Sequence, residues 1–247
     1  AMIQHAMENN QFRLLFQPVI SLRGDSDEHY GVLLRMLNPQ GEEVSPNDFI
    51  SAAKAEGLTE KIDRWVVLNS IKLLSEHRSK GHNTKLFVHI SGASLQDQSL
   101  LPWLSVALKA ARLPSDALII QFSEPDAIEY LKQAKTLTRG LAELHCKVSL
   151  TQFGCAANPF NTLKHLTVDF VKIDGSYTQD LSKPENLESL KVLLASLHSQ
   201  AKLTIVPYVE TASTMSTFWQ AGVNYIQGYF LQGPSQGMDY EFSSGNE

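Results

Sequence analysis

The sequence lacks the basic excess that is typical of nucleic-acid-binding proteins. Its 247 residues carry 21 Lys and Arg against 26 Asp and Glu, which gives a formal net charge of −5. Proteins that bind DNA or RNA normally gather positive charge to meet the phosphate backbone. The charged fraction of 19% and the hydrophobic fraction of 43% favour a packed globular chain over a disordered one. We therefore expect no DNA or RNA partner.

Cysteine, glycine and proline are also scarce, and long apolar runs are missing. Cys146 and Cys155 match no metal-binding spacing, which predicts free thiols in a reducing compartment. The 14 Gly and 10 Pro are too few for a low-complexity chain. No segment approaches the roughly 18 consecutive apolar residues that span a membrane, and the N-terminus lacks the apolar core of a signal peptide. We expect a cytoplasmic protein without membrane insertion. We also expect the first residue to lie inside a longer natural chain.

Apolar runs of strand length alternate with helix-period segments along almost the whole chain. Several runs, such as 85–91 and 118–123, are almost continuously apolar, as is typical of parallel strands covered on both faces. The strand candidates are residues 12–20, 29–37, 85–91, 118–123, 147–151, 170–173, 203–207 and 225–228. This alternation indicates an α/β fold built from repeated strand–helix units.

The number of repeated units predicts a (β/α)8 TIM-like barrel, and a doubly wound open sheet is the alternative. The first two strand candidates are joined by a polar turn with no crossover helix, so we expect one antiparallel strand in an otherwise parallel barrel. We assign a lead-in helix to residues 1–11, the barrel to 12–237 and a polar tail to 238–247. The segment after Gly233 is expected to fray because it is polar.

Polar side chains stand at the predicted strand ends, where a barrel of this kind places its functional site. They are rich in amides and cations: Gln17, Arg35, His89, Ser91, Glu124, Gln152, Lys172, Asp174, Tyr208, Glu210 and Gln227. A hydrolytic Mg²⁺ or Mn²⁺ site needs several convergent oxygen ligands, and only Glu124, Asp174 and Glu210 are available. Arg35 with amides and Tyr208 instead suits phosphates and purine bases without a metal.

An ordered set of motifs resembles EAL domains, the bacterial phosphodiesterases that open cyclic di-GMP. The motifs are FQPVISL at 16–22, LLR at 33–35, PNDFI at 46–50, IDRWV at 62–66, VHIS at 88–91, QFSE at 121–124, VDFVKIDGS at 168–176 and QGYFLQGP at 227–234. The resemblance covers nearly the whole chain and implies the barrel with one antiparallel strand that characterises the family. Within the family, these segments look most like a regulator of type IV pili and twitching motility that joins degenerate diguanylate-cyclase-like and EAL regions.

The positions that hold metal in active family members depart from the pattern. The resemblance aligns Gly31 with a glutamate, His89 with an asparagine, Gln121 with a glutamate, and Thr151 and Gln152 with paired aspartates. Every anionic ligand at these positions is therefore replaced. Because a metal is what activates the attacking water, we expect a degenerate phosphodiesterase that needs no metal and has no useful activity.

The nucleotide-binding surface implied by the resemblance is better retained. We expect it to bind cyclic di-GMP through Gln17, Pro18, Leu33, Leu34, Arg35, Asp63, Arg64, Tyr208, Glu210, Gln227, Gly228 and Pro234. Arg35 is interpreted as a phosphate ligand, with pairing to Asp63 as the alternative. Tyr208 stands where the family has a glycine and is expected to stack on a guanine. Gln17 could instead satisfy backbone groups, and Asp63 could merely hold Arg64.

Other titratable side chains are interpreted without a function. Glu124 is read as an acid at a helix N-terminus, and Lys172 with Asp174 as a relic ion pair. His77 and His82 lie near a helix end and are expected to be solvated surface. His89 is read as a satisfied strand histidine rather than a metal ligand.

Two rival functions stay open beside the receptor. The first is a residual phosphodiesterase that uses Glu124, Asp174 and Glu210 in an altered metal arrangement. The second is a protein-interaction domain that has lost the ligand as well. The resemblance also implies a protein partner in pilus regulation, of PilZ type or a pilus-assembly component.

Overall fold

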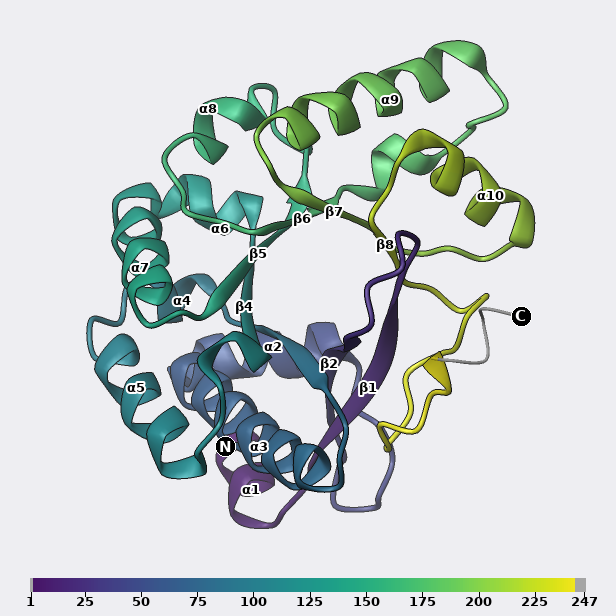
Figure 1. The fold of residues 1–247 in the computed structure, drawn as a ribbon. Coiled ribbons are helices and arrows are strands. Elements are labelled where there is room, and N and C mark those ends of the chain that lie inside the picture. Colours follow the sequence, from purple (N-terminus) through teal and green to yellow (C-terminus); the bar gives the residue numbers. More distant parts are fainter. Residues whose placement is uncertain (1, 243–247) are drawn as a thin grey trace.

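A closed barrel of eight strands, placed in chain order around the ring, forms the centre of the computed structural model, which describes residues 2–242 (Figure 1). The strands are β1 (Phe12–Ser21), β2 (Glu28–Met36), β3 (Thr84–His89), β4 (Leu118–Ser123), β5 (Lys147–Phe153), β6 (Phe170–Ile173), β7 (Leu203–Val206) and β8 (Tyr225–Ile226). β1 pairs antiparallel with both β2 and β8, and all other neighbours are parallel. The expected barrel with one antiparallel strand is confirmed, because the short β1–β2 connection leaves no crossover.

Helices surround the barrel on the outside (Figure 1). They are α1 (Met2–Glu8), α2 (Pro46–Glu56), α3 (Thr59–Ser79), α4 (Gly92–Leu95), α5 (Leu100–Ala111), α6 (Glu124–Glu129), α7 (Leu131–Glu143), α8 (Pro159–Leu163), α9 (Pro184–Ser199) and α10 (Ala212–Ala221), with 3-10 turns η1 (Ser115–Ala117) and η2 (Gly175–Thr178). Local sequence explains their ends. The Ser123 side chain accepts a hydrogen bond from the Asp126 amide at the start of α6, and Gly57 ends α2 in the left-handed conformation at φ 68°.

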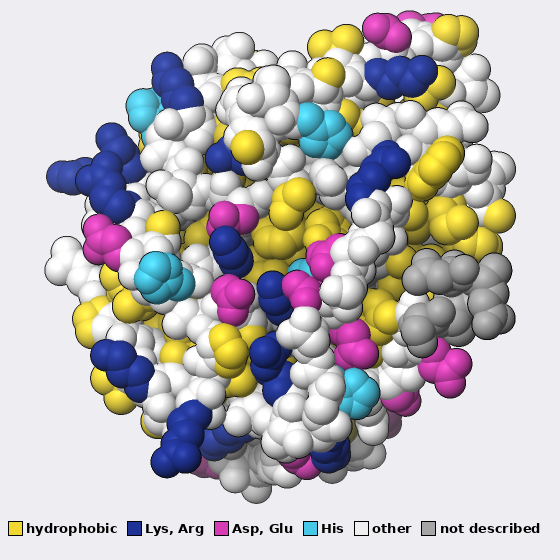
Figure 2. All heavy atoms as spheres, viewed as in Figure 1, with side chains coloured by type: hydrophobic (Ala, Val, Ile, Leu, Met, Phe, Trp, Pro, Cys, Tyr) yellow, Lys and Arg dark blue, Asp and Glu magenta, His cyan; other side chains and the backbone are white. Residues whose placement is uncertain are grey.

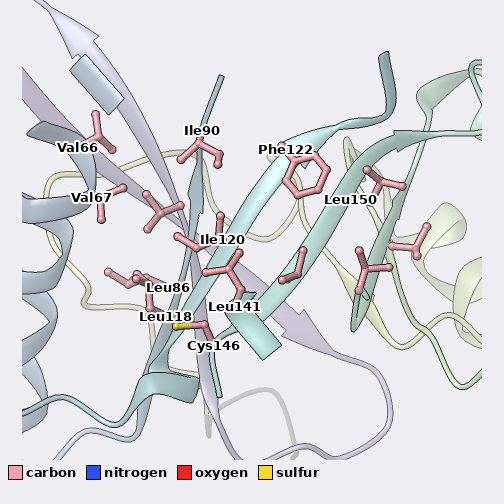
Figure 3. Packing of buried hydrophobic residues seen from close by; sticks show 14 of the residues in the cluster. Val66, Val67, Leu86, Ile90, Leu118, Ile120, Phe122, Leu141, Cys146 and Leu150 are labelled. Atoms are coloured by element: carbon pink, nitrogen blue, oxygen red, sulfur yellow. The ribbon is translucent and has the colours of Figure 1, made fainter. Parts of the chain in front are cut away.

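The main hydrophobic core fills the space between the strands and the ring of helices. Figure 3 shows Val66 and Val67 of α3 on the side of Leu86 of β3, and Leu118 of β4 together with Cys146. A smaller cluster lies apart from this main core and consists of Val19, Phe87, Ile119, Phe170, Ile205 and Tyr225. Cys146 is buried and Cys155 exposed, and both are free, as the sequence predicts. Burial of apolar surface in these two layers fixes the strand ends in space.

The C-terminal segment packs against the barrel as far as it is described. Phe16 and Ser235 form an isolated bridge, the Tyr240 amide donates to the Tyr30 hydroxyl, and the Phe242 ring meets the Tyr30 ring edge-on at 5.3 Å. Met238 is also packed against the core. The prediction of fraying after Gly233 is therefore wrong up to residue 242, because apolar rings within this polar segment find a site on the barrel. Residues 243–247 of the predicted tail lie outside the described residues.

The molecular surface carries both signs of charge in close mixture. On the face drawn in Figure 2, acidic and basic side chains alternate around an apolar centre rather than gathering by sign. Within residues 2–242, no helix combines the length and the apolar character that crossing a bilayer requires.

Candidate functional site

A cavity of about 320 Å³ lies at the C-terminal ends of the parallel strands, where barrels of this architecture place their sites. Its lining comes from distant parts of the chain: Gln17, Gly31, Val32, Leu33, Arg35, Phe87, Gln121, Lys172, Pro207, Tyr208, Gln227, Gly228, Tyr229 and Pro234. Of the ligand-binding residues predicted from the sequence, the fold thus brings together Gln17, Leu33, Arg35, Tyr208, Gln227, Gly228 and Pro234. We call this space the mouth cavity.

A hydrogen-bonded chain of one lysine and two amides crosses the mouth cavity. Lys172 Nζ donates to Gln227 Oε1 at 3.0 Å, Gln227 Nε2 donates to Gln17 Oε1 at 3.1 Å, and Gln17 Nε2 donates to the Gln232 carbonyl at 3.2 Å. Gln17 and Gln227 are buried. Desolvation lowers the pKa of Lys172 to about 8, since the enclosed ammonium has no carboxylate beside it. The chain is therefore a preformed cationic, amide-rich wall.

Arg35 offers a second cation to the cavity. Its Nη1 donates to the Leu34 carbonyl at 3.1 Å, and within residues 2–242 it forms no salt bridge. The alternative that Arg35 pairs with Asp63 does not occur. A half-buried guanidinium with free donors is suited to pair with an anion in bidentate fashion.

Asp63 is engaged in holding the loop after β3. Its Oδ2 accepts hydrogen bonds from the Ser91 amide at 2.8 Å and from the Ser94 hydroxyl at 2.6 Å, and the Ser91 hydroxyl also donates to it. Burial raises the pKa of this carboxyl, and the serine hydrogen bonds oppose that rise. Asp63 thus positions the start of α4 and does not line the mouth cavity.

Arg64, predicted with Asp63 as a ligand contact, also lies outside the lining of the cavity. Its Nη2 is 2.7 Å from Asp97 Oδ2 and also contacts the Ser99 hydroxyl, and its guanidinium lies 5.0 Å from the centre of the Trp103 ring. The side chain is therefore tied to the loop between α4 and α5.

Three further predicted contacts flank the mouth cavity without lining it. Pro18 is a buried β1 residue that follows Gln17, and Leu34 meets the site through the carbonyl that Arg35 binds. Glu210 is exposed after β7.

Glu124 is fully buried and anchors the loop that follows β5. Its carboxylate accepts hydrogen bonds from the Gly154 amide at 3.1 Å and the Ala156 amide at 2.8 Å. It also lies 3.4 Å from the Cys155 sulfur, and together with desolvation it raises the pKa of that thiol to about 11. Glu124 does begin α6, but its buried contacts give it a larger structural role than the sequence indicates. A metal could use this carboxylate only after the loop had opened.

The other two candidate acids are also unsuited to a shared metal. Asp174 Oδ2 accepts from both the amide and the hydroxyl of Ser176 and so caps η2, and Glu210 is exposed. The predicted ion pair of Lys172 and Asp174 is wrong: in the described part of the chain no salt bridge joins them, and Lys172 binds Gln227 instead.

The positions aligned with the family's metal ligands carry neutral side chains in the structure too. Gln121 Oε1 accepts a hydrogen bond from the Ser149 hydroxyl, and the His89 side chain is exposed at the end of β3. A Cβ at Gly31 would lie 2.8 Å from Gln227 Nε2, so the amide occupies the space of a longer side chain. Within residues 2–242, no three His, Cys, Asp or Glu ligand atoms converge at this end. This donor set does not fit a hydrolytic Mg²⁺ or Mn²⁺ ion.

Tyr208 projects at the rim of the mouth cavity from a backbone that favours glycine. Its φ is 62° and its side chain is 74% exposed. The ring lies above Gly175, whose Cβ would be 3.8 Å from it. A non-glycine residue at positive φ costs free energy and is enriched at functional sites. An exposed aromatic face at the rim is available for stacking.

Sequence reasoning missed part of the lining. Lys172 was interpreted as a relic although it borders the cavity, and Tyr229, which is 71% exposed at the rim, was not singled out. Lys172 lies in the motif VDFVKIDGS within β6, and Tyr229 lies in QGYFLQGP after β8, so both belong to segments that resemble the family.

Comparison with known proteins places this geometry among related structures. A family model described as EAL domain matches residues 1–234. The structure is similar to the FimX EAL domain from Pseudomonas aeruginosa bound to c-di-GMP, at 68% identity over 98% of both chains with a TM-score of 0.94. It is also similar to the Xanthomonas citri FimX EAL domain in complex with c-diGMP, at 32% identity over 98% of this chain and 94% of that one, with a TM-score of 0.91.

A curated relative is named as an enzyme. The cyclic di-GMP phosphodiesterase PdeF from Escherichia coli (strain K12) is 28% identical over 238 residues, which cover 96% of this chain. The match spans 32% of that protein, so the chain corresponds to about a third of its length.

Proposed function

The chain belongs to the EAL domain family, and from this premise we propose that it is a receptor that binds cyclic di-GMP without a metal and does not open it. The observation that carries the proposal is the unpaired Arg35 beside the Lys172–Gln227–Gln17 chain, in a cavity without convergent carboxylates. Two cations and two amides match a dianionic dinucleotide better than they match a hydrolytic metal centre.

Each part of the mouth cavity has a distinct task in this proposal. Arg35 pairs with a phosphate through two parallel N–H donors, and Lys172 adds positive charge from the barrel interior. Tyr208 stacks on one guanine at the rim. Gln17 and Gln227 present amide groups that can satisfy polar edges of the ligand, although they now satisfy each other and must exchange that hydrogen bond on binding.

The same residues argue against turnover. Hydrolysis by this family relies on a metal to generate hydroxide, by lowering the pKa of bound water from 15.7 toward about 7. Glu124 is committed to the loop after β5 and Asp174 to Ser176. Among residues 2–242, exposed Glu210 has no carboxylate neighbours that could share an ion with it. The single ammonium of Lys172 cannot supply this activation of water.

We further propose that ligand binding regulates type IV pilus-based twitching motility through a PilZ-type or pilus-assembly partner in the cytoplasm. The support for this is the 68% identity with the FimX EAL domain over 98% of both chains. Binding transmits a signal only if the ligand favours one conformation or complex over another. Partner capture in the presence and absence of cyclic di-GMP tests this step.

The binding test is calorimetric titration with cyclic di-GMP in EDTA, run beside a turnover assay on the same sample with Mn²⁺ or Mg²⁺. We expect saturable binding in EDTA and no linear dinucleotide after hours. Turnover that Glu210→Ala abolishes would instead establish a residual phosphodiesterase. Absence of binding at high micromolar ligand would leave a protein-interaction domain that ignores the nucleotide.

A further inference from the structure

Three metal-ligating side chains meet at the end of the barrel opposite the mouth cavity. Glu28 is the first residue of β2, His77 lies in the last turn of α3, and His82 lies in the loop before β3. The two imidazole rings stack with centroids 4.0 Å apart and an interplanar angle of 11°. The sequence position of His77 predicts solvated surface. That prediction is wrong, since the His77 side chain is only 14% exposed. We call these three residues the basal cluster.

The ligand atoms of the basal cluster are close to the spacing that a tetrahedral ion requires. Glu28 Oε2 lies 3.2 Å from His82 Nδ1 and 4.0 Å from His77 Nε2, and one ligand atom from each residue lies within 4.8 Å of the others. Tetrahedral ligands at about 2.0–2.1 Å from zinc stand roughly 3.3–3.4 Å from one another. Closing the cluster around an ion requires at least one imidazole to rotate out of the stack, because a metal lies in the plane of each ring that binds it.

One of these atoms lacks a hydrogen bond. Within residues 2–242, His77 Nε2 is buried and forms none, and Glu28 Oε2 lies 4.0 Å away. A buried polar atom that lacks a partner is uncommon and indicates a missing water or ion.

Neighbouring groups hold the Glu28 carboxylate in place, and the cations of α3 bind other partners. The buried Thr84 hydroxyl donates to Glu28 Oε2 at 2.9 Å, as outer-shell partners of metal ligands do. Arg78 donates to the Thr84 carbonyl at 2.7 Å, and Lys80 lies 3.9 Å from Glu76. Neither cation forms a salt bridge to Glu28 in the described part of the chain.

A neighbouring acidic group shows the contrast. Asp25, Asp27 and His29 also place ligand atoms together, but Lys85 Nζ lies 2.8 Å from Asp27, and the Tyr225 hydroxyl donates to Asp25. An ammonium already pairs with one carboxylate of that group and a tyrosine hydroxyl binds the other, so we assign it no ion.

We propose that Glu28, His77 and His82 form a binding site for a zinc-class divalent metal ion. Two imidazoles and a carboxylate are a ligand set that zinc takes with a water as fourth ligand, whereas Mg²⁺ prefers oxygen ligands alone. His82 is 42% exposed, which leaves a path for the ion and the water. The ion joins β2, α3 and the loop before β3, so it stabilises the N-terminal end of the barrel and takes no part in the mouth cavity.

The test uses the 247-residue chain without an affinity tag, stripped with chelator and titrated with Zn²⁺ in competition with a chromophoric zinc indicator. We expect one equivalent to bind, and we expect Zn²⁺ but not Mg²⁺ to raise the melting temperature. His82→Ala, at an exposed position, should weaken Zn²⁺ binding at least tenfold. The matched control His165→Ala, at an exposed histidine outside the cluster, should leave Zn²⁺ binding unchanged.

Equal Zn²⁺ affinity in the parent chain and His82→Ala would overturn the proposal, as would a melting temperature indifferent to Zn²⁺. Absorption of the Co²⁺-loaded chain in the visible region gives a second readout, which His82→Ala should remove. Cyclic di-GMP binding in EDTA serves as the folding control for the variant. It also separates this proposal from the receptor function, because that assay contains no free metal.

Discussion

The two ends of the barrel differ in whether their charged side chains are paired. At the mouth cavity, Arg35 and Lys172 have no carboxylate partner in the described part of the chain. At the opposite end, Asp27 contacts Lys85 at 2.8 Å, and Glu28 contacts His82 at 3.2 Å. An unpaired cation attracts an anionic ligand, whereas a paired one contributes mainly to folding. The barrel axis therefore separates cations that are available to an anionic ligand from charges that are paired within the fold.

Aromatic rings pack inside the barrel at its basal end, and Phe87 extends this group to the lining of the mouth cavity. Phe170 lies 5.0 Å from Phe87, 5.8 Å from Tyr225 and 6.1 Å from His29, measured between ring centroids. At the mouth, the exposed ring of Tyr208 has no such neighbours among the ring contacts of residues 2–242. The two ends should therefore respond differently to the same kind of truncation.

The largest expected effect is loss of stability on Phe170→Ala. The residue is 5% exposed, and removing a buried phenylalanine costs about 3–5 kcal/mol through lost burial and the cavity left behind. Denaturant unfolding measures it. Leu203→Ala is the matched control, since Leu203 pairs with Phe170 in register but is 37% exposed, and we expect it to cost well under half as much. Equal losses in both variants would contradict a basal aromatic core.

Arg35→Ala should have the second largest effect, and it should act on binding alone. Loss of a charge-assisted hydrogen bond costs about 1.5–3 kcal/mol, which corresponds to roughly 10- to 150-fold in the affinity for cyclic di-GMP. Unfolding should change little because the side chain makes a single backbone hydrogen bond. Calorimetry beside Arg139→Ala, an exposed arginine on α7, provides the comparison. Unchanged affinity would remove Arg35 from the site.

Much of the fold could be predicted because it depends on local patterns. The apolar runs locate every strand, and the helix-free turn between residues 12–20 and 29–37 predicts the antiparallel pair. The mouth cavity follows from the rule that strand ends converge in a barrel. That rule places Arg35, Gln17 and Gln227 together although they are far apart in the sequence.

What could not be predicted depends on which side chain meets which across the fold. Glu124 reads as a helix acid, yet its partners are backbone amides after the next strand. The sequence predicts surface positions for His77 and His82, because their stacking depends on how the end of α3 and the loop before β3 meet in the fold. Tyr240 and Tyr30 are 210 residues apart in the sequence, and no local pattern predicts the hydrogen bond between them.

Tyr208→Gly should change stability and binding in opposite directions. Glycine accepts the observed φ of 62° without the steric cost that tyrosine carries, so stability should rise by up to about 1 kcal/mol. Loss of a stacked ring should weaken cyclic di-GMP binding by about 1–3 kcal/mol. Tyr208→Phe is the control that retains both the ring and the strain. If glycine left the affinity unchanged, the ring would not contact the ligand.

The smallest effect concerns the charge of Lys172 and is read from pH. Desolvation lowers its pKa to about 8 from the ordinary 10.5, so above pH 8 the folded chain binds fewer protons than the unfolded one, and stability from this group rises with pH toward 10.5. Binding should run the other way, because the ammonium that attracts the phosphates is lost. We expect affinity to fall by about 1 kcal/mol between pH 7 and pH 9, the size of a partly screened ion pair. Calorimetry at both pH values should show no such fall in Lys172→Met, and an equal fall in that variant would assign the titration to another group.

A stability that drops between pH 8 and 10 in the parent but not in the variant would contradict the buried, unpaired ammonium itself. The charge would then be held by a carboxylate, and the contrast between the two ends of the barrel would disappear.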